Sequence, residues 1–149
     1  MKRAESYIKM SRIEDKIEEI EKYLSDLEEF IPLTFEDYKQ DLKTKAACEH
    51  YFEKIIEACE DLTFLIIKEQ SLEIPEEDKT GFNILFDKDL ISREIFEKLK
   101  DAKGMRNIIT HEYGKIDDEL VFESVAEQLI PDVRKFIKEL ERFIKHEKP

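Results

Sequence analysis

Residues 13–27 read Ile13-Glu-Asp-Lys-Ile17-Glu-Glu-Ile20-Glu-Lys-Tyr-Leu24-Ser-Asp-Leu27 and contain the clearest pattern in the chain. The isoleucines and leucines recur at steps of four and three, and polar residues fill most positions between them. This spacing places the apolar side chains on one face of an α-helix. Pro32 follows shortly afterwards and disfavours continuation, so the spacing predicts an amphipathic first helix that ends before Pro32.

A second helical segment is predicted from Thr34 to about Glu69. Thr34 is a suitable N-cap, with Asp37 three residues further on. A helix of this length is expected to bend or break, at a position that the pattern does not fix. Polar residues and a proline predict a loop over residues 71–80, and a short helical turn is expected over 81–87. The expected buried face of the second segment comprises Leu42, Ala46, Phe52, Ile55, Ile56, Cys59, Leu62 and Ile66.

Two more helices are predicted in the C-terminal half. Ser92 caps a helix that carries Ile95, Phe96, Leu99 and Met105 on its apolar face. Gly104 lies inside this helix and predicts either a discontinuity or a close approach of another backbone. Asp117 or Asp118 caps the last helix, in which Pro131 is expected to cause a kink. The expected buried side of the last helix comprises Leu120, Val121, Val125, Leu129, Val133, Ile137, Leu140 and Ile144.

Composition and length favour an all-α fold. The 149 residues include three glycines, four prolines and no tryptophan, and 42% of them are charged. Four to five helices with short connections predict an antiparallel bundle, formed by one domain over residues 1–149. No apolar run reaches the length of about 18 residues that spans a membrane, so we expect no membrane partner and a cytoplasmic location. Cys48 and Cys59 are about 16 Å apart along one helix, which predicts reduced core residues.

The stretch Arg106-Asn-Ile-Ile-Thr-His111-Glu-Tyr113 gathers a fixed cation, an amide, an imidazole and a phenol within eight residues. These groups are sufficient to cleave RNA without a metal, because imidazole moves protons near neutral pH and guanidinium matches a phosphate. On a helix, Asn107 and His111 share one face, and Tyr113 lies near the face of Arg106. Arg106 and His111 diverge by about 140°. A working pair therefore needs a helix end near His111 or a second copy of the chain. The simpler alternative is a histidine that makes local hydrogen bonds at a helix end.

Charge bears on this interpretation in two ways. The net charge of −12 argues against general nucleic-acid binding. Residues 98–115, however, contain five cations against two carboxylates, a net +3. Such a segment can form a local phosphate-binding cleft, although a charged run of this size is more often a solvated helix face.

Other chemistries lack the residues that they require. No histidine has a glutamate three positions before it, the glycines are too scattered for a P-loop or a dinucleotide-binding turn, and no Cys-x2-Cys pair is present. We therefore expect no metal and no cofactor. His50 and His146 are interpreted as a helix-surface residue and a tail residue without functional roles.

The chain resembles the HEPN superfamily, in particular the HepT-like toxins encoded beside a minimal nucleotidyltransferase (MNT) antitoxin. The family pattern Arg-x4-His-x-Tyr is matched by Arg106, His111 and Tyr113, with the polar Asn107 after the arginine. The chain differs where many relatives carry Gly-Asn-His and it has Thr63-Phe64-Leu65. Further similarity lies in residues 17–24, 35–38, 46–49, 56–58, 116–118 and 129–132.

The resemblance implies a homodimeric helical bundle with a cleft between protomers where two motifs meet. It also implies a metal-independent endoribonuclease toxin in which His111 takes the proton of a ribose 2'-hydroxyl, Arg106 stabilises the charge on phosphorus, and Asn107 orients either group. The MNT antitoxin would inactivate the toxin by transferring AMP to Tyr113. Two alternatives stay open: a non-catalytic companion that holds a substrate for an MNT nucleotidyltransferase, and a dimeric scaffold in which the motif is structural.

Overall fold

The computed structural model describes residues 2–72, 80–112, 114 and 116–147. Four long helices dominate it, and this part of the chain contains no strand. The predicted all-α fold is thus confirmed. The long helices are α1 (Lys2–Phe30), α3 (Leu42–Glu69), α5 (Arg93–His111) and α7 (Ile130–Glu147). Three short helices and a π-helical turn join them: α2 (Phe35–Gln40), α4 (Gly81–Asp87), α6 (Asp118–Glu123) and η2 (Ser124–Leu129).

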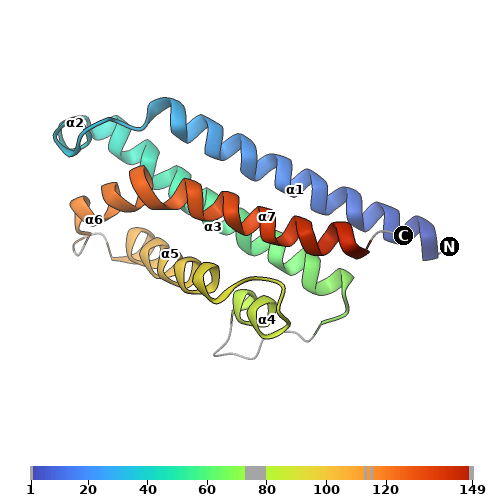
Figure 1. The fold of residues 1–149 in the computed structure, drawn as a ribbon. Coiled ribbons are helices and arrows are strands. Elements are labelled where there is room, and N and C mark those ends of the chain that lie inside the picture. The colour runs from blue at the N-terminus through green and yellow to red at the C-terminus, as the bar shows by residue number, and fades with distance from the viewer. Residues whose placement is uncertain (1, 73–79, 113, 115, 148–149) are drawn as a thin grey trace.

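The long helices alternate in direction and form the predicted antiparallel bundle (Figure 1). α1 packs against α3, α3 against α5, α5 against α7, and α7 against α1. One cluster of buried side chains fills the space between them. It includes Ile13, Ile20, Leu24 and Leu27 of the predicted α1 stripe, against which Ile17 packs from the edge. α1 ends at Phe30, before Pro32 as predicted.

The break in the second helical segment lies at Asp41. Thr34 caps α2 by accepting a hydrogen bond from the backbone N–H of Asp37 (3.2 Å), as predicted. Asp41 then ends α2 and caps α3, because its Oδ1 accepts from the N–H groups of Lys43 and Thr44 at 3.1 and 3.2 Å. The expectation that Leu42 and Ala46 are buried is wrong: Leu42 is 74% exposed and Ala46 is also exposed. Both residues lie in α3 but off its buried face, which starts at Cys48, because six residues of helix separate Leu42 from Cys48 and Ala46 from Phe52, a rotation about 120° away from that face.

α4 confirms the short helix expected over 81–87. Most of the loop predicted over 71–80 lies outside the described residues, since 73–79 are not described. At the start of α4, a Cβ at Gly81 would lie 2.7 Å from Cγ2 of Thr63 on α3. Glycine therefore allows α4 to begin in close contact with α3.

Ser92 is the N-cap of α5 and also links this helix to α7 by hydrogen bonds. Its Oγ accepts from the N–H of Ile95 at 3.2 Å, which confirms the predicted cap. The N–H and hydroxyl of Ser92 donate to the carboxylate of Glu139 at 2.6 and 2.9 Å. α5 then continues without interruption to His111, so Gly104 does not break it. A Cβ at Gly104 would meet no atom of the described chain within 4 Å, so this glycine also serves no close approach there.

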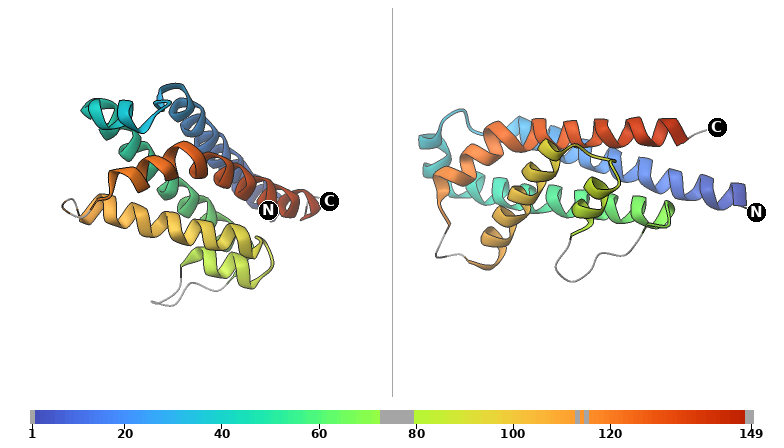
Figure 2. Two further views of the ribbon diagram at one scale, coloured as in Figure 1. Left: turned by 60° about the vertical axis from the view of Figure 1, so that its left-hand side comes forward. Right: turned by 60° about the horizontal axis from the view of Figure 1, so that its bottom comes forward.

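The last helical segment begins at Asp117, whose Oδ1 accepts from the N–H groups of Glu119 and Leu120. The expected buried side is confirmed except at two positions: Ile144 is half-buried, and Leu120 is 51% exposed in the first turn of α6, before the segment joins the bundle. The kink expected at Pro131 takes the form of η2, immediately before α7, where the ribbon bends (Figure 2). Pro131 has no N–H and its ring clashes with the carbonyl four residues earlier, so a wider turn is favoured there.

Candidate active site

The C-terminal end of α5 carries the motif and divides it between two faces of the helix. Asn107 and His111 are exposed, whereas Arg106 is half-buried against α3. α5 ends at His111, and the N–H of Glu112 closes the last turn on the carbonyl oxygen of Ile108 at 2.9 Å. The contacts of Arg106 are made with α3 and not with His111. One chain therefore brings Asn107 and His111 together on a face, but it does not bring Arg106 to His111.

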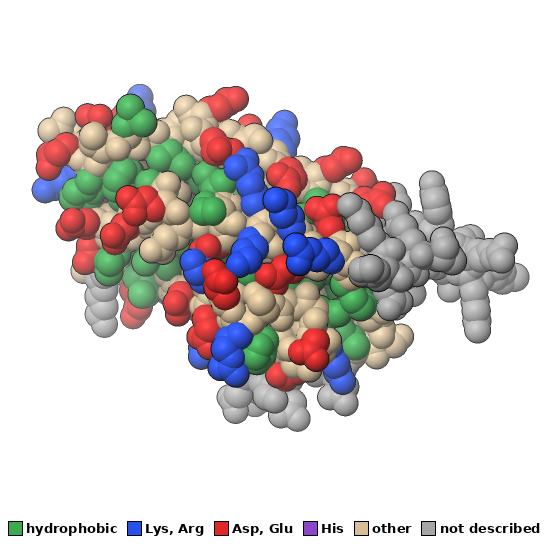
Figure 3. Space-filling view, viewed as in Figure 1, with side chains coloured by type: hydrophobic (Ala, Val, Ile, Leu, Met, Phe, Trp, Pro, Cys, Tyr) green, Lys and Arg blue, Asp and Glu red, His purple; other side chains and the backbone are tan. Residues whose placement is uncertain are grey.

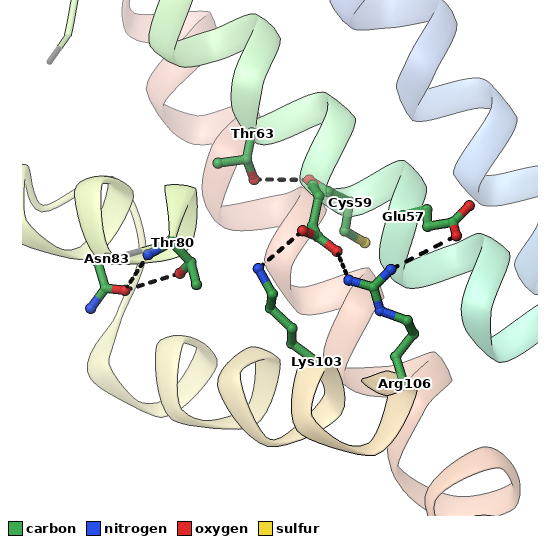
Figure 4. A network of polar contacts seen from close by, with 8 residues as sticks. Glu57, Cys59, Thr63, Thr80, Asn83, Lys103 and Arg106 are labelled. Atoms are coloured by element: carbon green, nitrogen blue, oxygen red, sulfur yellow. Dashed lines mark hydrogen bonds and ion pairs between the residues drawn. The ribbon is translucent and has the colours of Figure 1, made fainter. Parts of the chain in front are cut away.

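Arg106 is held by two glutamates of α3 (Figure 4). Its Nη2 donates to Oε1 of Glu60 at 2.9 Å, and its Nη1 lies 3.8 Å from Oε1 of Glu57. Lys103, one turn earlier on α5, donates from Nζ to Oε2 of Glu60 at 3.2 Å. The side chains of Arg106, Lys103 and Glu60 are 18%, 27% and 30% exposed, whereas that of Glu57 is 55% exposed. Glu60 thus bridges two cations at the partly buried contact between α3 and α5.

Two buried polar atoms on α5 have no partner among the described residues: Nε of Arg106 and Oγ1 of Thr110. The two residues are four apart and share the helix face that packs toward α3. A buried donor without an acceptor costs about 1–3 kcal/mol, so such atoms are rare in native structures. The α3-facing side of α5 therefore keeps hydrogen-bonding capacity for a further polar group.

The basic segment predicted over 98–115 is largely compensated by carboxylates from other helices. Besides the pairs of Arg106 and Lys103, Nζ of Lys98 lies 3.2 Å from Oδ1 of Asp132. Lys115 lies outside the described residues. Basic side chains also gather along α7, with acidic ones among them (Figure 3). There Lys135 pairs with Glu94 at 2.8 Å, so the positive charge of this face is also partly compensated.

Sequence reasoning missed Glu60 and the pairing of Lys103. The signal was present as two matched spacings: Glu57 and Glu60 are three apart on α3, and Lys103 and Arg106 are three apart on α5. Residues three apart lie on one side of a helix, so the two pairs face each other once the helices pack. The packing of α3 against α5 is the fact that the sequence alone did not provide.

Of the other candidate residues, Tyr113 lies outside the described residues. His50 is exposed, with its ring edge-on to Tyr51 at 6.3 Å between centroids. Cys48 and Cys59 are buried free thiols, as predicted, and burial raises the pKa of Cys48 to about 11. Thr63, in the position where the pattern differs from relatives, is buried and donates its hydroxyl to the carbonyl oxygen of Cys59.

Among the described residues, no group of three or more His, Cys, Asp or Glu side chains is arranged to hold a metal ion. None of their helices combines the length and apolar character needed to cross a membrane.

Comparison with known proteins identifies the family. The family model described as "Ribonuclease HepT-like" matches residues 20–140. The chain belongs to the HepT-like ribonuclease family. The mRNA nuclease HepT of Shewanella oneidensis is 30% identical to it over 100 residues, which cover 67% of this chain and 74% of that protein. A putative RNase of Archaeoglobus fulgidus is 28% identical over 132 residues, covering 87% and 98% of the two chains.

The solved structures agree with the family. The tri-AMPylated HEPN toxin of Shewanella oneidensis, solved in complex with an MNT antitoxin, superposes with a TM-score of 0.79 at 25% identity. The superposition covers 87% of this chain and 96% of that one. The resemblance to HepT-like HEPN toxins and the prediction of a nuclease are therefore confirmed.

Proposed function

We propose that this HepT-like protein is the toxin of a toxin–antitoxin pair and acts as a metal-independent endoribonuclease. The observation that carries the proposal is the end of α5, where an imidazole and an amide are exposed on one face beside a half-buried guanidinium. The family match and the nucleases among its relatives support RNA as the substrate.

In the proposed reaction, His111 removes the proton from a ribose 2'-hydroxyl. The 2'-oxygen then bonds to the adjacent phosphorus as the bond from phosphorus to the 5'-oxygen breaks. Arg106 stabilises the negative charge that grows on the phosphoryl oxygens, and Asn107 orients His111 or the phosphate. The products are a 2',3'-cyclic phosphate and a 5'-hydroxyl.

The proposed active form is a homodimer. The divergence of Arg106 and His111 on one continuous helix supports it, because a second copy can supply the missing group. Lys100, Gly104, Asn107 and His111 follow one another on the exposed face of α5, and Gly104 leaves open space there. If two copies of α5 approach each other at Gly104, His111 of the partner subunit protonates the leaving 5'-oxygen.

The proposed regulator is an MNT-type nucleotidyltransferase that transfers AMP to Tyr113. The sequence places this phenol two residues beyond His111, where an adduct would add bulk and negative charge beside the site. The AMPylated state of the Shewanella oneidensis HEPN toxin supports this assignment.

A second candidate is the non-catalytic companion of a minimal nucleotidyltransferase. One observation favours it: Arg106 already pairs with Glu60 and lies near Glu57, and it makes no contact with His111. In this alternative Arg106 and His111 only bind phosphate groups.

Expression of the chain with and without a neighbouring nucleotidyltransferase tests these proposals. We expect the chain alone to arrest growth and degrade RNA, and His111→Ala to do neither. In vitro, a chelator should leave cleavage intact, and products should end in 2',3'-cyclic phosphate. Cleavage that needs an added divalent metal and leaves 5'-phosphates would contradict the mechanism. An inactive wild-type chain would favour the non-catalytic companion.

Co-expression with the nucleotidyltransferase tests the proposed modification. One or more AMP masses should appear on the peptide that contains Tyr113, and Tyr113→Phe should keep cleavage while escaping inhibition.

A further inference from the structure

The two glutamates that contact Arg106 differ in how firmly they are held. Both carboxylate oxygens of Glu60 are engaged, Oε1 by Arg106 at 2.9 Å and Oε2 by Lys103 at 3.2 Å. Its side chain is 30% exposed. Two charge-assisted hydrogen bonds from α5 fix the carboxylate of Glu60, and this carboxylate in turn fixes one edge of the guanidinium of Arg106.

Glu57 makes a much weaker contact. Its Oε1 lies 3.8 Å from Nη1 of Arg106, which is too long for a hydrogen bond, and its side chain is 55% exposed. The structure gives it no second cation among the described residues. Exposed ion pairs of this kind add little stability, so another anion can replace Glu57 with little cost to the fold.

Two polar atoms on the side of α5 that faces α3 also lack hydrogen-bond partners among the described residues. Nε of Arg106 and the hydroxyl of Thr110 are buried without partners in the described chain. A phosphate diester offers two charged oxygens and accepts strong hydrogen bonds from guanidinium. The donors of Arg106 therefore fit an oxyanion at the exposed position that Glu57 occupies.

We propose that the two α3 carboxylates have separate tasks: Glu60 positions the guanidinium of Arg106, and Glu57 is a resident anion that a substrate phosphate displaces. This inference rests on the proposed ribonuclease function and deepens it. Lys103, Arg106, Glu57 and Glu60 together carry no net charge. When Glu57 turns into solvent, the remaining three carry one positive charge, which matches one phosphodiester.

Exchange of anions at Glu57 is tested by Glu57→Gln, with Asp61→Asn as the matched control. Asp61 lies on the same helix, is 65% exposed and pairs weakly with Lys16 of α1 at 3.6 Å, so its substitution changes the net charge equally without touching Arg106. We expect Glu57→Gln to lower the KM for RNA about two- to fivefold at low salt with kcat unchanged. Added salt should reduce the difference. Equal KM values for Glu57→Gln and Asp61→Asn would overturn this part of the inference.

The positioning role of Glu60 is tested by Glu60→Gln, which keeps the shape of the side chain but removes its charge. We expect kcat to fall about tenfold or more, because a displaced guanidinium no longer meets the charge that grows on the phosphoryl group. Affinity for a short RNA, measured in a His111→Ala background, should not weaken. A variant that only lowers the melting temperature and keeps kcat would show that Glu60 has a structural role alone.

The binding measurement separates this inference from the proposed function. If the wild-type chain cleaves RNA and Glu57→Gln binds it no tighter than Asp61→Asn, the exchange is wrong and the ribonuclease stands. If the chain does not cleave RNA but Glu57→Gln still binds it more tightly than the control, the ribonuclease is wrong and the exchange stands. In that case the role assigned to Glu60 is also wrong, because it depends on the proposed reaction.

Discussion

The two sides of α5 differ in what the chain itself provides. On the side that faces α3, Lys103 and Arg106 are half-buried and hydrogen-bonded to Glu60. On the neighbouring exposed side, Asn107 and His111 lie together, and Gly104 beside them leaves open space. The position of the cation is therefore set by intramolecular contacts, whereas the imidazole has no comparable support within one chain.

The geometry of the α-helix explains this division. Five residues rotate a side chain by about 140°, so Arg106 and His111 cannot share a face while α5 stays helical. Asn107 and His111, four apart, do share one. A continuous helix with this motif thus presents its cation and its imidazole to different surroundings, and the proposed reaction therefore requires a second molecule to complete the site.

The largest effects on RNA cleavage are expected from alanine substitutions on the two sides of α5. His111→Ala should reduce RNA cleavage by about 10²–10⁴-fold, the usual contribution of general acid–base catalysis, with no change in melting temperature because the side chain is exposed. Arg106→Ala should abolish cleavage as well, and it should also lower the free energy of unfolding by about 1 kcal/mol, because it removes a partner of Glu60. Cleavage assays and thermal melts of the same preparations provide the comparison.

Either of two outcomes would contradict the proposed difference between the two sides of α5. A fully active His111→Ala variant would exclude the imidazole from the reaction. Equal melting temperatures for Arg106→Ala and the wild-type protein would show that the contacts of Arg106 with α3 do not stabilise the fold.

An intermediate effect is expected at Gly104, on the exposed side. Gly104→Ala should raise the stability of the monomer by about 0.5–1 kcal/mol, because alanine favours the helix and no described atom lies within 4 Å of the new Cβ. Gly104→Leu should keep the helix but block the approach of a partner, and so lower both self-association and cleavage. Sedimentation velocity and denaturant unfolding measure the two properties separately. A dimer that survives Gly104→Leu would place the interface elsewhere.

The smallest effect on the site is expected from Asp41→Ala, at the far end of α3. The hydroxyl and N–H of Thr44 donate to Asp41 and hold the pKa of its carboxyl below the ordinary value. The loss of this cap should lower the melting temperature by a few degrees at about pH 7 and leave RNA cleavage unchanged.

The pH dependence of this effect has a definite sign. Because the pKa of Asp41 is lowered in the folded state, its contribution is complete above the pKa of the unfolded chain and disappears as the pH falls through the folded value. The difference in melting temperature between Asp41→Ala and the wild-type protein should therefore shrink in acid. A difference that stays constant down to about pH 2 would assign the effect to something other than the carboxylate.

Local signals predicted much of the fold. The caps at Thr34 and Ser92 and the end of α1 before Pro32 depend on residues that are neighbours in sequence, so the pattern indicated them correctly. Asp41 was missed because apolar residues continue in helical spacing on both sides of it. Leu42 was expected in the core for the same reason, although it lies in the first turn of a new helix.

The site was predictable only in part. The divergence of Arg106 from His111 follows from helical rotation and is confirmed by the contacts of Arg106 with α3. The role of Glu60 required knowledge of which helix packs against α5, because its partners are 43 and 46 residues away in sequence. The catalytic roles of Arg106, Asn107 and His111 and the modification of Tyr113 stay predictions.

The attachment of Ser92 to Glu139 has a consequence for hydrogen exchange along α5. Hydrogen bonds tie the start of the helix to α7 and its middle to α3, whereas the last turn contributes buried Ile109 to the core but makes no hydrogen bond to another helix among the described contacts. Local opening is easiest where tertiary contacts are fewest, so amide protection should decrease from the turn after Ser92 toward His111. If a second copy of the chain covers this end of α5, amide protection should rise first at residues 108–111. Hydrogen exchange at these amides therefore measures directly whether a second copy completes the proposed site.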